Sequence, residues 1–243
     1  MTITAELLLP LLETDLERRR YSFILGTLVA HRALFAGRRA LDFGASWGTS
    51  AIALSRAGAS EVVGVEPDLG RVERGRQLIA RAAPGVAIAM HHVEDTLHLP
   101  FKDGEFPFVL ANGVIEHIPQ PRDAYLREVW RVLAPEGHLM ITETPNKYFP
   151  KDQHTTQLWL NHWLPSRLAH RRAIWWGRFR AERTDWASSG WRGLSYPELV
   201  RPLRNYRHVP SPLERWRHTV LNALGLPAEL IDPWPVWIIQ KTR

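Results

Sequence analysis

The chain has 243 residues, 45% of them hydrophobic, which is enough to bury the core of one large domain with a modest appendage. It contains no cysteine, so a disulfide scaffold and a thiolate metal site are excluded. No stretch approaches the ~20 apolar residues of a transmembrane helix. Residues 1–10 lack the basic start and the cleavage site of a signal peptide, so we expect a cytoplasmic protein.

The formal net charge of +6 is unevenly distributed. Residues 1–150 hold 16 Lys and Arg against 18 Asp and Glu, whereas residues 151–243 hold 15 against 7. Nine of the 11 tryptophans also follow residue 150. This change in composition predicts a structural boundary near Pro150.

Apolar residues recur at helical spacing through residues 6–36, and Gly37 follows as a helix stop. The segment is therefore expected to form one or two amphipathic helices ahead of the first strand. Tyr21 lies within it and is expected to pack in the core rather than contact a ligand.

The stretch Ala40–Gly48 predicts the end of a buried strand, a tight turn and the start of a helix. Gly44 and Gly48 stand where a side chain would keep the backbone away from a ligand. The amides at the start of the helix then face the turn. A second apolar strand, 61–65, ends on Glu66, whose carboxylate can bind both hydroxyls of a ribose.

The alternation of strands and helices continues beyond Glu66 and indicates an α/β fold. Asp68 is a suitable N-cap for the next helix. The expected elements are a helix over 68–82, strands over 86–90 and 106–111, a helix over 121–133, a strand over 138–143, a helix over 197–203 and a final antiparallel strand over 236–240.

Residues 38–144 resemble class I S-adenosylmethionine-dependent methyltransferases, and in particular the type 11 methyltransferase core. The family pattern is acid-x-Gly-x-Gly-x-Gly, with a second acid ending the next strand. Asp42, Gly44 and Gly48 match it, and Ser46 replaces the middle glycine. A nicotinamide-binding Rossmann protein is the alternative. Asp42 disfavours it, because the methyl donor carries an ammonium group and no pyrophosphate.

The resemblance implies a Rossmann-like, seven-stranded, mostly parallel sheet with helices on both faces, an antiparallel last strand and a helical lid insertion. The implied domains are an N-terminal lid (1–37), the S-adenosylmethionine-binding core (38–145), an acceptor-binding insertion (146–233) and the final strand of the core (234–243).

The resemblance also implies the residues that bind the donor. They are Asp42, Gly44, Gly48, Glu66, Asp95, Thr96 and Asn112. Asp95 stands before a Leu-Pro-Phe, where the family has a carboxylate that accepts a hydrogen bond from adenine. A solvated loop acid is the alternative for Asp95. The family usually has an aspartate at Pro107, which puts one support of the fourth strand in doubt.

Methyl transfer to a hydroxyl needs a group that removes the proton or lowers the pKa of the hydroxyl. His117 is the expected base, with Glu116 as its orienting or electrostatic partner and His154 as a second candidate base. A purely structural role for His117 is the alternative. Glu116-His117 also resembles the Glu-x-x-Glu-His metal site of ubiquinone-pathway and small-RNA methyltransferases. Gly113 replaces the first glutamate of that site, so a metal such as Mg²⁺ is not favoured. If one binds, Glu116, His117, Glu143 and His154 are its candidate ligands.

The expected activity is O-methylation of a sugar or oligosaccharide hydroxyl, for example on a methylated mannoside. The alternatives are a lipid, quinone or natural-product O-methyltransferase and, in another class, a non-catalytic binding subunit with this fold. Trp159 and Trp163 are expected to lie in a lid over the acceptor. The basic, Trp-rich residues 171–180 would otherwise suit a membrane surface, RNA or a solvated lid face. A nucleic-acid partner is not favoured, and a homodimer is left open.

Overall fold

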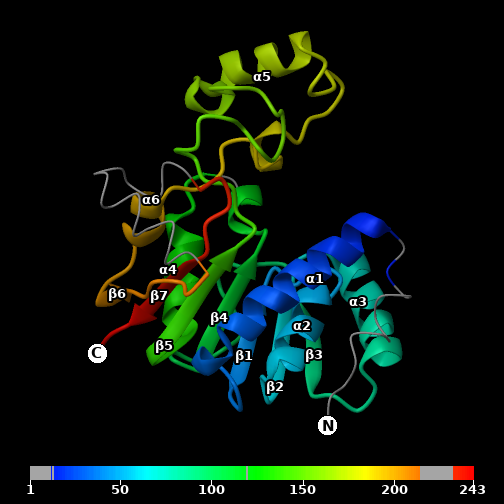
Figure 1. The fold of residues 1–243 in the computed structure, drawn as a ribbon, viewed down its shortest axis with the longest axis vertical. Helices are drawn as coiled ribbons and strands as arrows, with labels where there is room; N and C mark the ends of the chain where they lie inside the picture. The colour runs from blue at the N-terminus through cyan, green and yellow to red at the C-terminus, as the bar shows by residue number, and fades with distance from the viewer. Residues whose placement is uncertain (1–11, 13, 119, 214–231) are drawn as a thin grey trace.

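The computed structural model describes residues 12, 14–118, 120–213 and 232–243 (Figure 1). Predictions for residues 1–11, including the first part of the N-terminal helical run, lie outside the described residues. The strands are β1 (Arg39–Phe43), β2 (Glu61–Glu66), β3 (Ile88–His92), β4 (Phe106–Asn112), β5 (Leu133–Thr142), β6 (Tyr206–His208) and β7 (Trp237–Lys241). The helices are α1 (Asp15–Ala30), α2 (Thr49–Ala57), α3 (Leu69–Ala82), α4 (Asp123–Val132), α5 (Ser166–Trp175) and α6 (Tyr196–Val200).

The strands form one seven-stranded sheet in the order β3-β2-β1-β4-β5-β7-β6. Strands β1 to β5 are parallel, and β7 is antiparallel to both β5 and β6. The Rossmann-like fold and the antiparallel last strand are therefore as predicted. Strand β6 was not assigned from the sequence, because its three residues are all exposed and carry no apolar alternation.

Two hydrophobic cores cover the two faces of the sheet, because successive strand residues point to opposite sides. Ala40 and Val62 face the core beneath α1, α2 and α3, whereas Leu41 and Val63 face the core beneath α4 and α6. Burial on both faces explains the continuous apolar runs of these strands. The sheet is thus held from both sides, and its carboxyl edge is left for a site.

Local signals placed most boundaries correctly. Asp68 caps α3 by accepting the backbone N–H of Arg71 at 3.0 Å, and Ser195 begins α6 with a capping box. The third strand begins at Ile88, two residues later than predicted. Glu136 adopts a φ of 61°, a left-handed conformation that favours glycine.

The segment 146–233, called the excursion below, begins and ends at adjoining residues, and of its described part only β6 joins the sheet. The backbone N–H of Asn146 donates to the carbonyl of Pro233 at 2.9 Å, and its side-chain amide donates to Asp232 at the same distance. Helix α5 lies in this excursion, beyond the carboxyl ends of β4 and β5 (Figure 1). It has a small core of its own, made of Ala169, Ala173, Phe179, Trp186 and Trp191.

The tryptophans of the excursion divide between this core and the surface. Trp186 and Trp191 stack at 4.8 Å between ring centroids. Four others are exposed, namely Trp159, Trp163, Trp175 and Trp176. Among the helices that the structure describes, none combines the length and the apolar character needed to cross a membrane.

Candidate active site

A cavity of about 1580 Å³ lies at the carboxyl ends of β1, β2 and β4. Helix α1 lines one side of it, and residues of the excursion line another. The volume exceeds the ~300–1,000 Å³ of an ordinary small-molecule pocket. The cavity can therefore hold two ligands side by side.

The turn after β1 packs closely against the loop after β4. Gly44 has a φ of 75°, and a Cβ added there would lie 2.6 Å from both γ carbons of Val114. Gly44 lines the cavity, whereas Gly48 lies beneath the turn and begins α2. Ser46 stands at the middle-glycine position and has a positive φ of 47°. The turn thus keeps the glycine geometry in spite of the serine.

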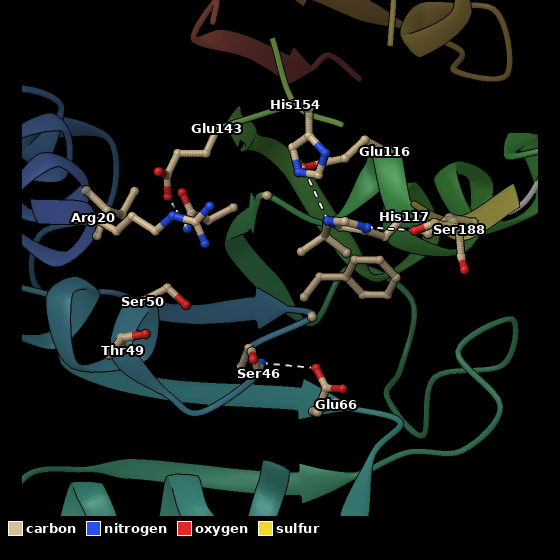
Figure 2. A pocket seen from close by; sticks show the side chains of 18 of the residues that line it. Arg20, Ser46, Thr49, Ser50, Glu66, Glu116, His117, Glu143, His154 and Ser188 are labelled. Carbon is tan, nitrogen blue, oxygen red and sulfur yellow. Dashed lines mark hydrogen bonds and ion pairs between the residues drawn. The ribbon is translucent and has the colours of Figure 1, made fainter. Parts of the chain in front are cut away.

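Glu66 ends β2 and ties the turn to that strand. Its side chain is nearly buried, and its Oε2 atom accepts the backbone N–H of Ser46 at 3.0 Å (Figure 2). Its Oε1 atom accepts the backbone N–H of Asp68 at 3.3 Å. The same carboxylate lines the cavity, so it is held in place to meet a ligand hydroxyl.

Asp42 lies beneath the turn and does not line the cavity. Its Oδ2 atom accepts the hydroxyl of Ser50 at 2.6 Å, and its Oδ1 atom accepts no hydrogen bond from any described group. Burial raises the pKa of Asp42 to about 7. The charge of Glu66 adds to this shift, and the Ser50 hydrogen bond opposes it.

The raised pKa of Asp42 predicts a pH-dependent stability. The folded chain retains at Asp42 a proton that the unfolded chain releases near pH 3.8, so the free energy of unfolding falls as pH rises from about 4 to about 7. Asp42→Asn removes this contribution. The melting temperature of the variant minus that of the wild type should therefore increase from pH 5 to pH 8. Each kcal/mol of difference in the free energy of unfolding corresponds to about 2–4 °C. Glu116 and Glu143 also have raised pKa values, and they act equally in both proteins. Parallel curves would contradict the role of Asp42.

Asn112 ends β4 in the cavity wall beside Glu143. Its side-chain amide donates to the Oε2 atom of Glu143 at 2.9 Å and accepts the hydroxyl of Thr142 at 2.7 Å. Burial raises the pKa of Glu143, and the charge of Arg20 opposes the shift. Arg20 reaches toward Glu143 from α1 (Figure 2). Sequence reasoning missed Arg20, because an arginine on an amphipathic helix usually belongs to the solvated face.

The structure separates Asp95, which was predicted to bind adenine, from its neighbour Thr96, which was predicted to bind the donor. Thr96 lines the cavity, whereas Asp95 does not. The carboxylate of Asp95 is exposed and accepts hydrogen bonds from His98 Nδ1 at 2.7 Å and from the backbone N–H of Leu97 at 2.9 Å. These bonds, His98 first, lower the pKa of Asp95. The adenine contact of Asp95 remains a prediction.

Glu116, His117 and His154 come together at the other end of the cavity, as Figure 2 shows. One ligand atom from each lies within 4.8 Å of the other two. Glu116 and His117 belong to a 3₁₀ turn after β4, and His154 belongs to the excursion. Glu143 is not a member of this group. The three residues are called the Glu116 cluster below.

Neighbouring residues fix the Glu116 cluster. The Oε2 atom of Glu116 accepts the hydroxyl of Thr144 at 2.8 Å, and His117 donates through Nδ1 to the carbonyl of Ser188 at 2.8 Å. Arg122 donates to the backbone carbonyls of Glu116 and Gly193, which joins the turn to the excursion. Burial raises the pKa of Glu116, and burial lowers the pKa of His154 to about 4. His154 is therefore neutral near pH 7.

The cavity lining fits the donor that the sequence motif implies. The Glu66 carboxylate can accept hydrogen bonds from ribose hydroxyls, and the Asn112 amide can hydrogen-bond to a nucleobase. Gly44 lets the backbone of the turn come close to the donor. Arg20 and Glu143 offer opposite charges for a carboxylate and an ammonium group. No thiolate or other covalent nucleophile is required for methyl transfer, because alignment and proton removal suffice.

The chain matches known methyltransferases over its central part. Residues 41–141 match the family model described as "Methyltransferase domain". Methyltransferase GfsG of Streptomyces halstedii is 31% identical over 108 residues, 44% of this chain and 38% of that protein. The 27-O-demethylrifamycin SV methyltransferase of Amycolatopsis mediterranei is 32% identical over 108 residues, 44% of this chain and 39% of that protein. The chain thus spans about two fifths of the length of these relatives.

A solved structure extends the likeness of the fold. The S-adenosylmethionine-dependent methyltransferase from Mesorhizobium loti has a TM-score of 0.52 and 16% identity, over 86% of this chain and 93% of that one. At this identity the likeness concerns the fold alone. The sequence match, the strand order and the contact between the Ser46 turn and Glu66 at the end of β2 agree with one another. Residues 41–141 accordingly match the methyltransferase domain family, and the fold around them is the Rossmann-like fold of S-adenosylmethionine-dependent methyltransferases.

Proposed function

We propose that this chain transfers a methyl group from S-adenosylmethionine to a hydroxyl of a sugar or oligosaccharide. One observation carries the proposal: a single cavity has the Gly44 turn and Glu66 at one end and the Glu116 cluster at the other. The first set suits the donor. The second set, a carboxylate with two imidazoles, suits the activation of a hydroxyl.

Each group has a distinct task in this proposal. Glu66 binds the ribose hydroxyls, and Asn112 binds beside them. The bound donor supplies an electrophilic methyl group. Residues of α1 and of the excursion close the cavity and exclude water. The Glu116 cluster faces the acceptor and activates its hydroxyl, with His117 Nε2 either receiving the proton or binding a cation that acidifies the hydroxyl. Catalysis then follows from alignment at about 3–3.5 Å and from proton removal.

The lining of the acceptor end favours a polar, ring-shaped acceptor. Trp234 lies 6.2 Å from His154 between ring centroids and lines the cavity. Arg178, Arg183 and Asp185 line it as well. An indole face can stack on a sugar ring, and charged side chains can bind its hydroxyls. Trp159 and Trp163 do not line the cavity, so Trp234 takes the role expected of them.

The second candidate acceptor is a hydroxyl of a natural product. The name of the Amycolatopsis relative, 27-O-demethylrifamycin SV methyltransferase, specifies a methyl group on an oxygen of a rifamycin. The match with that relative covers 44% of this chain, so the acceptor of the relative is only a candidate here. A binding subunit without activity is the alternative of another class, since a fold does not determine an activity.

Donor turnover decides among these functions. The chain is incubated with S-adenosylmethionine and, separately, with sugars, phenols, lipids and RNA, and S-adenosylhomocysteine is measured. Formation of S-adenosylhomocysteine with glycosides supports the proposal. Turnover with polyketide or phenol hydroxyls alone supports the second candidate. Binding of the donor without turnover in any pool supports the binding subunit.

Trp234→Ala should raise the KM for the acceptor about tenfold and leave the affinity for S-adenosylhomocysteine unchanged. The reason is that loss of one stacked ring costs about 1–1.5 kcal/mol at the acceptor end only. Trp163→Ala is the matched control, because Trp163 is exposed and lies outside the lining. Steady-state kinetics and calorimetry measure the two quantities. Equal effects of the two substitutions would place the acceptor elsewhere.

A further inference from the structure

The Glu116 cluster presents three lone pairs to one point. The Oε1 atom of Glu116 is buried and accepts no hydrogen bond from any described group. The Nε2 atoms of His117 and His154 each lie 3.9 Å from it. This separation is too long for a hydrogen bond, so the two imidazoles do not satisfy the carboxylate directly.

The hydrogen bonds on the far side of each ring fix the tautomers. His117 Nδ1 faces the carbonyl of Ser188, an acceptor only, so Nδ1 carries the proton. His154 Nδ1 faces the hydroxyl of Thr155 at 3.2 Å, and that hydroxyl donates to the carbonyl of Ser189 at 2.6 Å. The Thr155 oxygen must then accept from His154. Both Nε2 atoms therefore carry lone pairs toward Glu116.

We infer that the Glu116 cluster is a binding site for a divalent transition-metal cation. Two imidazole nitrogens and one carboxylate oxygen are a common ligand set for such ions, which then keep open coordination positions. Histidine ligands typically donate their other N–H to a carbonyl or hydroxyl, as His117 and His154 do. The mixture of nitrogen and oxygen favours Mn²⁺, Fe²⁺, Co²⁺ or Zn²⁺ over Mg²⁺, which prefers oxygen.

The dimensions of the Glu116 cluster require a small contraction on binding. Ligand atoms at about 2.1 Å from one ion lie roughly 3.0–3.4 Å apart. The 3.9 Å separations must therefore shorten by about 0.5 Å, and the widest separation, at most 4.8 Å, must shorten further. His117 can move because its side chain is 45% exposed. Gly190 leaves the room that the His154 ring occupies, since a Cβ there would lie 2.7 Å from His154 Nδ1.

This inference deepens the proposed function and rests on it only for the position of the acceptor. Because the Glu116 cluster lines the cavity, the open positions of the cation face the acceptor end. His117 and His154 then act as ligands rather than bases. A hydroxyl bound to the cation has a lowered pKa. From the sequence, His117 was expected to be a base and a metal was not favoured. The arrangement of the lone pairs in the structure favours the metal.

Binding of Mn²⁺ tests the site without donor or acceptor. The chelator-treated full chain, without a histidine tag, is titrated with MnCl₂, and free Mn²⁺ is followed by electron paramagnetic resonance. One Mn²⁺ per chain is expected. Glu116→Gln, His117→Ala and His154→Ala should each weaken binding at least about tenfold. Zn²⁺ should displace Mn²⁺, in keeping with the usual order of affinities.

His98→Ala is the matched control, since it removes an exposed histidine that pairs with a carboxylate outside the cavity. Melting curves verify that each variant folds. Glu116→Gln keeps the shape of the side chain and an acceptor for Thr144. No binding at millimolar Mn²⁺, or binding that the three substitutions leave unchanged, would overturn the inference. Methyl turnover by the chelated protein would support the proposed function and contradict a catalytic role for the metal. Mn²⁺ binding without turnover of any acceptor would support the metal site and contradict the proposed function.

Discussion

Replacing His117 by alanine is expected to lower kcat by about 10²–10⁴-fold, the usual worth of a positioned acid–base group. Its Nε2 atom is the most accessible of the three convergent atoms, because its side chain is 45% exposed while that of Glu116 is 1% exposed. The substitution removes either a base or a cation ligand. Affinity for S-adenosylhomocysteine should not change, because Glu66 lies at the other end of the cavity.

Chelation separates the two roles of His117. If the imidazole is a base, EDTA leaves the activity of the wild type unchanged. If it is a ligand, activity disappears with EDTA and returns when Mn²⁺ is added. His98→Ala serves as the control for histidine loss in general. A His117→Ala variant with normal kcat would remove the Glu116 cluster from the reaction altogether.

Glu66→Ala is expected to weaken S-adenosylhomocysteine binding by about 1.5–3 kcal/mol, which corresponds to roughly 10–150-fold. The carboxylate is a charged acceptor at the point where β2 ends, and it also holds the backbone of Ser46. Loss of the acceptor and loss of the contact with Ser46 should both weaken the binding of the donor product. Isothermal titration calorimetry measures the affinity directly.

Two further variants show whether the lost affinity comes from the charge of Glu66 or from its contact with Ser46. Glu66→Gln keeps an oxygen for the Ser46 amide and removes the charge, so its loss should be smaller than that of alanine. Glu73→Ala removes an exposed acid from α3 and should have no effect. A folded Glu66→Ala variant that binds S-adenosylhomocysteine as tightly as the wild type would dismiss the ribose contact.

The sequence predicted the features that short-range rules determine. A strand that ends at Phe43, a turn with two glycines and a second strand that ends on Glu66 all depend on neighbouring residues, and the structure has them. The apolar run 236–240 indicated a last strand, and the family resemblance implied that it is antiparallel, as β7 is. Long-range packing determines what was missed. The resemblance implied a lid at residues 1–37, but nothing local to Arg20 indicates that this side chain lines the cavity.

The tryptophans show the same limit. Composition changes near Pro150, but it cannot distinguish an indole in a small core from one on a surface. Trp186 is buried in the excursion, whereas Trp163, only 23 positions earlier, is half exposed. The approach of His154 to Glu116 likewise depends on how residues 38 positions apart fold back on each other. Proximity of the two was anticipated as a hypothesis, but their tautomers required the structure.

The meeting of the two ends of the excursion has an evolutionary consequence. Asn146 bonds to Pro233 and Asp232, so the two ends of the segment adjoin, and between them the chain supplies α5 beyond the sheet and β6 at its edge. A segment with adjoining ends can change its length or be exchanged with little loop-closure cost to the strands beside it. If this segment binds the acceptor, as proposed above, acceptor preference could diverge among descendants of one ancestral gene while β1 to β5 and the donor end of the cavity stay the same. Transplanting the segment between homologues offers a route to new regiochemistry.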